Sequence, residues 1–299
     1  MNKSVFNPSI SIVIPTYNHA QFLRTALDSI RAQTFDDWEA IVVNNFSEDN
    51  TIAVVESYDD PRIRLVNFSN HGIIAAARNH GLSLTQAPFV AFLDSDDFWY
   101  PEKLQRCMEK LAQGYDLVCH AEVWVGPAER RRTVHYGPEA RATYESLLLD
   151  GNCISTSAVV VRRESLERAG GFSVQPAFIT AEDYELWLKL ARNSARIGFV
   201  DEVLGEYLIH EGNQSRVALR NMQAVMAVFE HHRAALEGGI SARRSRRREA
   251  VILYSGARGL QDSGQYRQAW RYFFKAVLRY PWVARFYAAM FFNALGRRP

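Results

Sequence analysis

Hydrophobic and polar positions alternate in a regular order along the first hundred residues. Three stretches carry apolar residues at helical spacing and predict helices, at 21–30, 50–57 and 73–84. Four short runs rich in apolar residues lie around and between them and predict buried strands, at 9–14, 38–43, 62–66 and 88–93. Strands that alternate with helices in this way favour an α/β fold with a mostly parallel central sheet flanked by helices.

The pattern changes further along the chain. The middle is less regular, and its clearest signals are strand-like runs at 117–125 and 154–161 and a helical stretch at 182–191. Beyond Ser215 the periodic stretches are all helical. We therefore expect two parts, an α/β domain over 1–215 and an all-helical C-terminal region over 216–299.

The net charge of +2 hides a marked asymmetry. Residues 241–299 hold 13 Lys and Arg against 2 Asp and Glu, a balance of +11, whereas the first 240 residues have a balance of −9. Such a division is typical of an acidic body with a basic tail that faces an anionic partner. Membrane lipid and another protein stay open as partners. We expect no nucleic acid, because no base-stacking aromatic side chains are interleaved with the arginines of 243–248.

Composition argues against two further classes of protein. The 3 cysteines are too few and too widely spaced for a disulfide framework or a Cys-rich zinc site. The first residues lack the apolar segment of a secretory signal, and no run of about 18 apolar residues could span a bilayer. We expect a cytoplasmic protein with free thiols.

The strongest chemical signal is Asp94-Ser95-Asp96-Asp97, which follows an apolar strand. Three carboxylates at a buried strand end cost free energy unless a cation or hydrogen bonds offset them. A divalent cation with oxygen ligands, bridging substrate phosphates, supplies that compensation. The alternative is an Asp-rich turn that caps the next helix, a role that Asp97 could fill alone. The position at a strand end, where ligands bind in such sheets, favours the metal site.

Two weaker candidates lie nearer the N-terminus. Thr16 and Tyr17 end the first strand, where a Tyr ring can stack on a base, although such residues also make ordinary turns. Arg78 lies in a segment of small residues, 70–81, and could pair with a phosphate. The alternative for that segment is a helix packed closely on the sheet with Arg78 exposed.

Two more candidates lie in the less regular middle. Glu182-Asp183 opens an amphipathic helix, so either carboxylate could be a general base or could only stabilise the helix N-terminus. His210 follows a strand-like run, and a lone histidine is more often structural than a ligand.

In this order and at these spacings, the pieces resemble the inverting glycosyltransferases of family 2, which have the GT-A fold of nucleotide-diphospho-sugar transferases. The resemblance covers about residues 9–215. It rests on Ile12-Val-Ile-Pro-Thr-Tyr-Asn18, the segment 70–81, Phe92-Leu-Asp-Ser-Asp-Asp97-Phe-Trp, Gly170-Gly-Phe172 and Ala181-Glu-Asp-Tyr-Glu-Leu-Trp187. These motifs are specific to the family but not to one sugar.

The resemblance implies a role for each candidate residue. In the DXD motif Asp94 would face the ribose and sugar, and Asp96 would bind Mn²⁺ or Mg²⁺. Asp183 matches the catalytic base, and His210 matches a further contact to the metal or the diphosphate. The implied donor-binding residues are Thr16, Tyr17, Asn45, Arg78, Asp94 and Ser95.

One segment departs from the family pattern. Where many relatives have an Asp-Asp-Gly-Ser turn after the second strand, this chain has Asn44-Asn45-Phe46-Ser47. An Asn amide both donates and accepts, so Asn45 could still pair with a uracil-like edge, but it carries no charge. The departure puts the identity of the base in doubt rather than the activity. A UDP-sugar is favoured.

The implied activity is transfer of a sugar, a hexose in the first instance, from a nucleotide-diphospho-sugar to the hydroxyl of a glycan or lipid-linked acceptor. The transfer would be metal-dependent and inverting, and it would serve cell-surface polysaccharide or glycan biosynthesis. A nucleotidyltransferase-like enzyme is one alternative, although the segment 15–20 lacks the Gly-rich basic loop of those enzymes. A non-catalytic nucleotide-sugar-binding module is another, and the intact Asp94, Asp96 and Asp183 argue against it.

The C-terminal residues 264–281 weakly resemble one tetratricopeptide-type helical hairpin. The basic, aromatic tail leads us to expect peripheral contact with an anionic membrane surface, at the cytoplasmic face of the inner membrane and near a lipid-linked acceptor. The alternative is that these helices pack on the catalytic domain or on a second copy of the chain.

Overall fold

The computed structural model describes residues 7–127, 130–210, 218–236 and 239–296. The chain divides into two compact units. The first comprises Met1–Tyr144, Cys153–Val174 and Leu186–His210, and the second comprises Glu145–Asn152, Gln175–Glu185 and Glu211–Pro299. The predicted division at residue 215 is simpler than this one, because the chain enters the second unit twice before it ends there.

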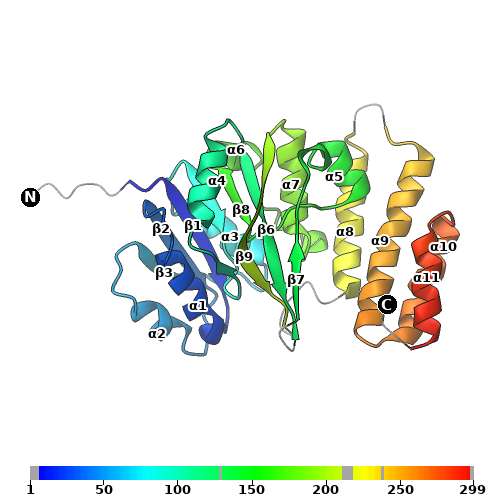
Figure 1. Ribbon diagram of the computed structural model, residues 1–299, viewed down its shortest axis with the longest axis horizontal. Helices are drawn as coiled ribbons and strands as arrows, with labels where there is room; N and C mark the ends of the chain where they lie inside the picture. Colours follow the sequence, from blue (N-terminus) through cyan, green and yellow to red (C-terminus); the bar gives the residue numbers. More distant parts are fainter. Residues whose placement is uncertain (1–6, 128–129, 211–217, 237–238, 297–299) are drawn as a thin grey trace, which may run out of the picture. The chain divides into compact units, whose positions relative to one another are not determined.

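The first unit is built on a nine-stranded mixed sheet, whose strands carry their labels in Figure 1. The strands are β1 (Ile10–Thr16), β2 (Trp38–Asn44), β3 (Ile63–Asn67), β4 (Phe89–Phe92), β5 (Phe98–Trp99), β6 (Leu117–Val125), β7 (Arg131–Val134), β8 (Val159–Arg162) and β9 (Ile197–Leu208). Their order is β3-β2-β1-β4-β8-β6-β9-β5, and β7 pairs with β6. Strands β1 to β4 are parallel, and the antiparallel β8 separates them from the parallel pair β6 and β9.

Helices of the first unit lie between these strands in sequence. They are α1 (Ala20–Arg31), α2 (Thr51–Glu56), α3 (Ile74–Ser83), α4 (Lys103–Leu111), the 3₁₀ helix η2 (Glu139–Arg141) and α6 (Arg163–Arg168). Helix α7 (Glu182–Arg192) begins in the second unit and continues in the first. The second unit contains almost all of α5 (Tyr144–Asp150) together with η3 (Pro176–Phe178), α8 (Ala218–Arg233), α9 (Ala242–Asp262), α10 (Tyr266–Arg279) and α11 (Ala284–Ala294).

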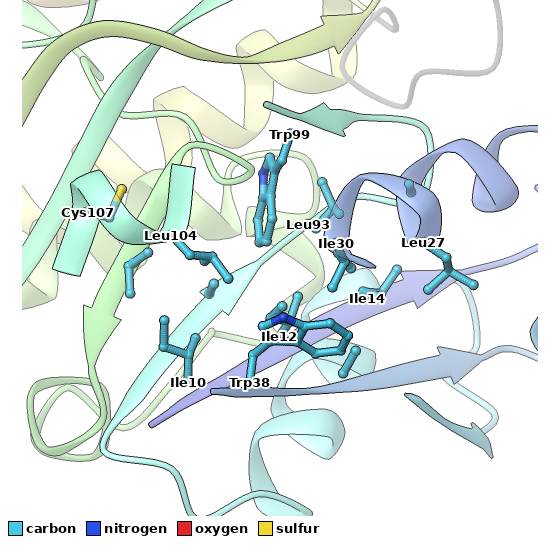
Figure 2. Packing of buried hydrophobic residues seen from close by; sticks show 14 of the residues in the cluster. Ile10, Ile12, Ile14, Leu27, Ile30, Trp38, Leu93, Trp99, Leu104 and Cys107 are labelled. Atoms are coloured by element: carbon cyan, nitrogen blue, oxygen red, sulfur yellow. The ribbon is translucent and has the colours of Figure 1, made fainter. Parts of the chain in front are cut away.

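Strand β1 lies at the centre of the first core, and every one of its residues is buried. A parallel strand covered on both faces is expected to be mostly apolar, and this one is apolar except for the buried Ser11 and Thr16. Its even-numbered residues Ile10, Ile12 and Ile14 pack in one cluster with the apolar stripe of α1 and with residues of α4, as Figure 2 shows.

The opposite face of β1 receives α3. A Cβ atom added at Gly81 of α3 would lie 2.5 Å from Val13 Cγ1, so the helix backbone approaches the sheet too closely for a larger residue to fit without a shift. This close packing holds α3, and with it Arg78, against the sheet.

The second unit has its own core among its C-terminal helices. Ala257 and Leu260 of α9 pack with Ala269 and Phe273 of α10 and with Ala289 of α11. A second cluster joins the same three helices through Ala250, Ala276 and Phe286. In the part of the chain that the structure describes, no helix is long and apolar enough to cross a membrane.

The α/β fold class is confirmed, and β1 to β4 and α1 to α3 lie within a few residues of their predicted positions. Strand β8 starts at Val159 rather than at 154, because the residues before it form turns. Helix α4 is the helix expected after the Asp-rich segment, whereas the two-residue β5 and the exposed β7 were not predicted.

Candidate functional site

The site lies where neighbouring parallel strands of the first unit end. Strand β1 ends at Thr16, which pairs in register with Asn44 at the end of β2, and the Asn45 N–H donates to the Thr16 carbonyl at 3.0 Å. On the other side of β1 lies β4, and the Asp-rich segment follows it directly. The sheet therefore gathers these side chains at one edge, the usual ligand-binding edge of such sheets.

Arg78 and Asp94 form a buried ion pair at this edge. Arg78 Nη2 lies 2.7 Å from Asp94 Oδ1, with the arginine side chain 4% and the aspartate side chain 26% exposed. The guanidinium also lies over the Phe172 ring, 5.3 Å from its centroid. The interpretation of Arg78 as an exposed helix residue is wrong, since the protein buries this cation beside the Asp-rich segment.

Asp96 is held by His210. The imidazole Nε2 and Asp96 Oδ2 are 2.8 Å apart, and the ring stacks on Phe22 of α1 with centroids 4.9 Å apart. Burial and then the charge of Asp94 raise the pKa of Asp96 above its usual range, while the hydrogen bond from His210 opposes that rise. A cation at this carboxylate would relieve both effects.

Asp97 has a structural role. Its side chain is buried and accepts hydrogen bonds from Ser157 Oγ at 2.5 Å and from the Leu208 N–H at 3.1 Å. Burial and the neighbouring carboxylates raise its pKa well above the ordinary value. The predicted alternative of a helix cap is wrong, because α4 has Glu102 as its N-cap and no side-chain capping bond.

Of the other residues predicted to bind the sugar donor, some contact the protein itself and some are left accessible or without a hydrogen bond to any residue that the structure describes. Thr16 is buried, and its hydroxyl has no hydrogen-bond partner among the described residues. Tyr17 is 51% exposed. The Asn45 side-chain oxygen accepts from the Asn70 N–H at 3.0 Å, and Ser95 Oγ lies 2.9 Å from His19 Nδ1. Thr16 and Tyr17 thus offer a buried hydroxyl and an accessible ring at the end of β1.

Asp183 belongs to the second unit, in the first turn of α7. Its Oδ1 accepts from the N–H of Tyr184 at 2.6 Å, so the carboxylate satisfies a backbone donor of that turn. Its role as catalytic base stays a prediction.

The donor atoms present fit a divalent cation bound together with a substrate. Among the described residues, no group of three or more His, Cys, Asp and Glu side chains is gathered for a metal ion. Asp96 and His210 provide one carboxylate and one imidazole, and Mn²⁺ or Mg²⁺ commonly completes its coordination with water and substrate phosphates. The residues therefore suit an ion that binds with a diphosphate.

Behind the Asp-rich segment lies a second set of buried polar groups. Glu122 is 1% exposed and accepts from the Tyr136 hydroxyl at 2.7 Å, and burial raises its pKa to about 7. The Lys103 ammonium donates to the Val159 carbonyl at 3.2 Å and lies 3.5 Å from the Trp99 ring centroid, and burial lowers its pKa to about 8. The charge of Glu122 acts on the Asp-rich segment, where it adds to the raised pKa of Asp97.

Three residues near the site were missed at the level of sequence. His19 and Ser157 contact the Asp-rich segment from 76 and 63 positions away, and no local pattern marks such contacts. Phe46 is 59% exposed and has a left-handed backbone with φ 55°, a conformation that favours glycine. Its occurrence at the glycine position of the Asp-Asp-Gly-Ser turn is a signal that could have drawn attention to it.

A mixed sheet with an arginine–aspartate pair and a histidine-held carboxylate at the ends of its parallel strands defines an α/β protein with a site for a charged ligand. Residues 11–170 match the model of glycosyl transferase family 2, and the chain belongs to that family. It is therefore a glycosyltransferase.

Two curated relatives illustrate the family. The chain is 29% identical over 212 residues to the putative teichuronic acid biosynthesis glycosyltransferase TuaG of Bacillus subtilis, covering 68% of this chain and 79% of that one. It is 29% identical over 193 residues to the Escherichia coli UDP-Glc:alpha-D-GlcNAc-diphosphoundecaprenol beta-1,3-glucosyltransferase WfgD, covering 62% and 70%. Such relatives act in polysaccharide and glycan biosynthesis.

Two solved structures share the GT-A fold with this chain. S. aureus TarS with UDP-GlcNAc has a TM-score of 0.65 at 18% identity, with 96% of this chain and 88% of that chain covered. The mannosyltransferase PcManGT of Pyrobaculum calidifontis with GDP-Man and Mn²⁺ has a TM-score of 0.63 at 19% identity, with 98% and 86% covered. At these identities the likeness establishes the fold.

Proposed function

We propose that this glycosyltransferase transfers a hexose from a nucleotide-diphospho-sugar, with a UDP-sugar favoured, to an acceptor hydroxyl. The transfer inverts the anomeric centre and depends on Mn²⁺ or Mg²⁺. One observation carries the proposal: the Arg78–Asp94 pair and the Asp96–His210 pair lie at the carboxyl ends of the parallel strands. The edge thus offers a fixed positive charge and a carboxylate that favours a cation, as a nucleoside diphosphate with its metal requires.

The relatives' names support the donor and the acceptor class. TarS was solved with UDP-GlcNAc and PcManGT with GDP-Man and Mn²⁺. WfgD uses UDP-Glc and a diphosphoundecaprenol-linked sugar, and TuaG is assigned to teichuronic acid biosynthesis. A role in cell-surface polysaccharide biosynthesis, with a glycan or lipid-linked acceptor, follows for this chain as part of the proposal.

In the proposed mechanism Thr16, Tyr17 and Asn45 bind the nucleoside, with the Tyr17 ring stacked on the base. Asp94 and Ser95 orient the ribose and sugar. Asp96 and His210 would hold the metal ion, which when bound would neutralise charge on the leaving diphosphate.

Arg78 contributes a second positive charge to the leaving group, in a site where burial strengthens its field. Asp183 accepts the proton of the acceptor hydroxyl as that oxygen attacks the anomeric carbon. A single displacement, with this one base opposite the leaving group, would invert the anomeric centre.

The test uses the purified full chain with a panel of nucleotide-sugars and Mn²⁺, and measures donor binding by calorimetry and transfer or slow donor hydrolysis by product release. Asp183→Asn should lower transfer about a thousandfold and leave donor affinity nearly unchanged, since it removes only the base. Asp96→Asn should weaken donor binding chiefly in the presence of Mn²⁺.

Asp201→Asn is the matched control for Asp96→Asn, because the Asp201 side chain is 88% exposed on the same unit as Asp96. Normal transfer by both site variants would contradict the proposed roles. The anomeric configuration of the first-formed product, read by NMR, tests inversion separately.

A further inference from the structure

The last part of the chain has an unusual composition. Residues 263–299 contain no Asp or Glu, 7 Lys and Arg, and 11 aromatic residues. The cations are Arg267, Arg271, Lys275, Arg279, Arg285, Arg297 and Arg298. Helices α10 and α11 of the second unit form most of this segment, and Figure 1 shows them in orange and red.

Helix α10 buries one face and exposes a mixed cationic and apolar face. Its buried residues Ala269, Phe273 and Ala276 pack in the cores of the unit. The other side carries a stripe at helical spacing, formed by Arg267, Arg271, Phe274 and Leu278. Phe274 is 54% and Leu278 83% exposed, and Trp270 stacks on Phe274 with centroids 5.3 Å apart. An outward helix face with two large apolar side chains is not the usual polar surface.

Helix α11 is apolar on two faces. Phe286, Ala289 and Asn293 are buried, whereas one turn apart on the other side Tyr287, Phe291 and Leu295 are 48%, 63% and 51% exposed. Trp282, between the two helices, is 81% exposed. We call these exposed residues of α10, α11 and Trp282 the C-terminal surface.

We propose that the C-terminal surface binds the face of an anionic phospholipid bilayer. Arginine and lysine side chains bind anionic headgroups, and exposed aromatic and aliphatic side chains enter the interfacial region of a bilayer. The C-terminal surface presents both kinds of side chain together. At 11 residues α11 spans about 16 Å and cannot cross a bilayer core of about 30 Å, so the helices would lie along the membrane surface.

The charges of the segment favour this occupant over a second copy of the chain. Helices α10 and α11 hold no carboxylate, and of their cations Arg279 pairs with Glu249 of α9. A symmetric dimer through this surface would bring the remaining cations of two copies together, and like charges across an interface are unfavourable. The proposal rests on the second unit alone and does not depend on the proposed donor site.

The test is flotation of the full chain with vesicles of phosphatidylcholine alone or of an equal mixture of phosphatidylcholine and phosphatidylglycerol. We expect flotation with the anionic vesicles, little with the neutral ones, and release as salt is raised, because screening weakens the attraction to the surface. Flotation that is equal on both vesicles, or absent from both, would overturn the proposal.

Two pairs of variants locate the binding face. Arg267→Gln with Arg271→Gln should lower partition roughly 25-fold, since each cation contributes about fivefold near an anionic surface. Phe291→Ser should lower it roughly tenfold through lost apolar contact. Arg132→Gln on β7 and Val174→Ser, both exposed in the first unit, are the matched controls and should float as the wild type does. A loss that is equal in the controls would refute the assignment to this surface.

Sedimentation velocity provides the discriminating measurement for a protein partner. A wild-type dimer that Phe291→Ser dissociates, in a chain that binds no vesicles, would assign the surface to a second copy and overturn the membrane proposal. A wild-type monomer that floats with anionic vesicles, and whose variants stay folded by thermal unfolding, would support it.

Discussion

Most proteins bury apolar residues and expose polar ones. The carboxyl ends of the strands in the first unit and the C-terminal surface of the second unit depart from this rule in opposite ways. At the strand ends Asp96 and Asp97 are buried carboxylates with raised pKa values, supported by His210 and Ser157. On α10 and α11 large apolar side chains are exposed next to cations, of which Arg279 pairs with Glu249 of α9. Sequences depart from ordinary patterning mainly at functional sites. The first departure fits a small charged ligand, and the second fits an extended anionic surface.

Two tryptophans give the largest expected difference between the regions. Trp99 is 1% exposed, and its indole N–H donates to the Ser157 carbonyl at 2.7 Å, whereas Trp282 is 81% exposed. Trp99→Ala should lower the free energy of unfolding by about 4 kcal/mol, because it opens a cavity behind the Asp-rich segment. Trp282→Ala should change it by less than about 0.5 kcal/mol. Urea unfolding of the two variants measures both. A large loss in Trp282→Ala would mean that the C-terminal surface is covered within the protein.

The pH dependence of stability gives the next largest effect. Glu122 has an ordinary pKa of 4.5 and a folded pKa of about 7. Because the folded pKa is the higher one, the stability from this group is complete below about pH 4.5 and is lost as the pH rises through about 7. Relative to Glu122→Gln, the wild type should therefore lose roughly 3 kcal/mol across that window.

Unfolding at pH 5 and at pH 8 checks this expectation. Glu230→Gln, at an exposed position of α8 in the second unit, is the control and should follow the wild-type curve. Parallel curves for the wild type and Glu122→Gln would show that Glu122 keeps its charge when buried.

The sequence predicted the features that depend on neighbouring residues, and it did not predict those that depend on residues far apart along the chain. Strand β1 and helix α1 follow from local apolar periodicity, so their positions were predicted closely. The Arg78–Asp94 pair spans 16 residues, and its motifs drew attention to both partners but not to their contact. The Leu208–Asp97 hydrogen bond spans 111 positions and arises only once β9 has joined the sheet. Exposure of Phe291 likewise depends on which face of α11 packs, because both faces are apolar.

A pair of arginines tests whether the charge at the strand ends serves the reaction. Arg78→Gln removes the buried cation beside Asp94 and should lower kcat/KM about a hundredfold, with circular dichroism as the check on folding. Arg246→Gln changes an exposed arginine of α9 in the second unit and should leave kcat/KM within about twofold. Equal losses of kcat/KM in the two variants would indicate that the reaction depends on the total positive charge of the protein and not on Arg78 in particular.

Two helix glycines give the smallest expected difference. A Cβ at Gly81 would lie 2.5 Å from Val13 Cγ1 and 3.1 Å from Val43 Cγ2, whereas one at Gly256 of α9 would lie 2.5 Å from Met222 Sδ. Valine is stiff and sits in a close-packed sheet, whereas Met222 can rotate its Sδ and Cγ away and keep only a Cβ contact of 3.0 Å. In both helices alanine gains about 1 kcal/mol of helix propensity over glycine.

The steric cost should therefore exceed the gain only in the first unit. Gly81→Ala should lower the free energy of unfolding by about 1–2 kcal/mol and shift Arg78 enough to weaken donor binding. Gly256→Ala should stay within about 0.5 kcal/mol of the wild type, since the methionine side chain yields. Urea unfolding with calorimetric donor titration measures both properties. Equal destabilisation of Gly256→Ala and Gly81→Ala would mean that Met222 cannot move aside. The two units would then not differ in how well their packing accommodates an added methyl group.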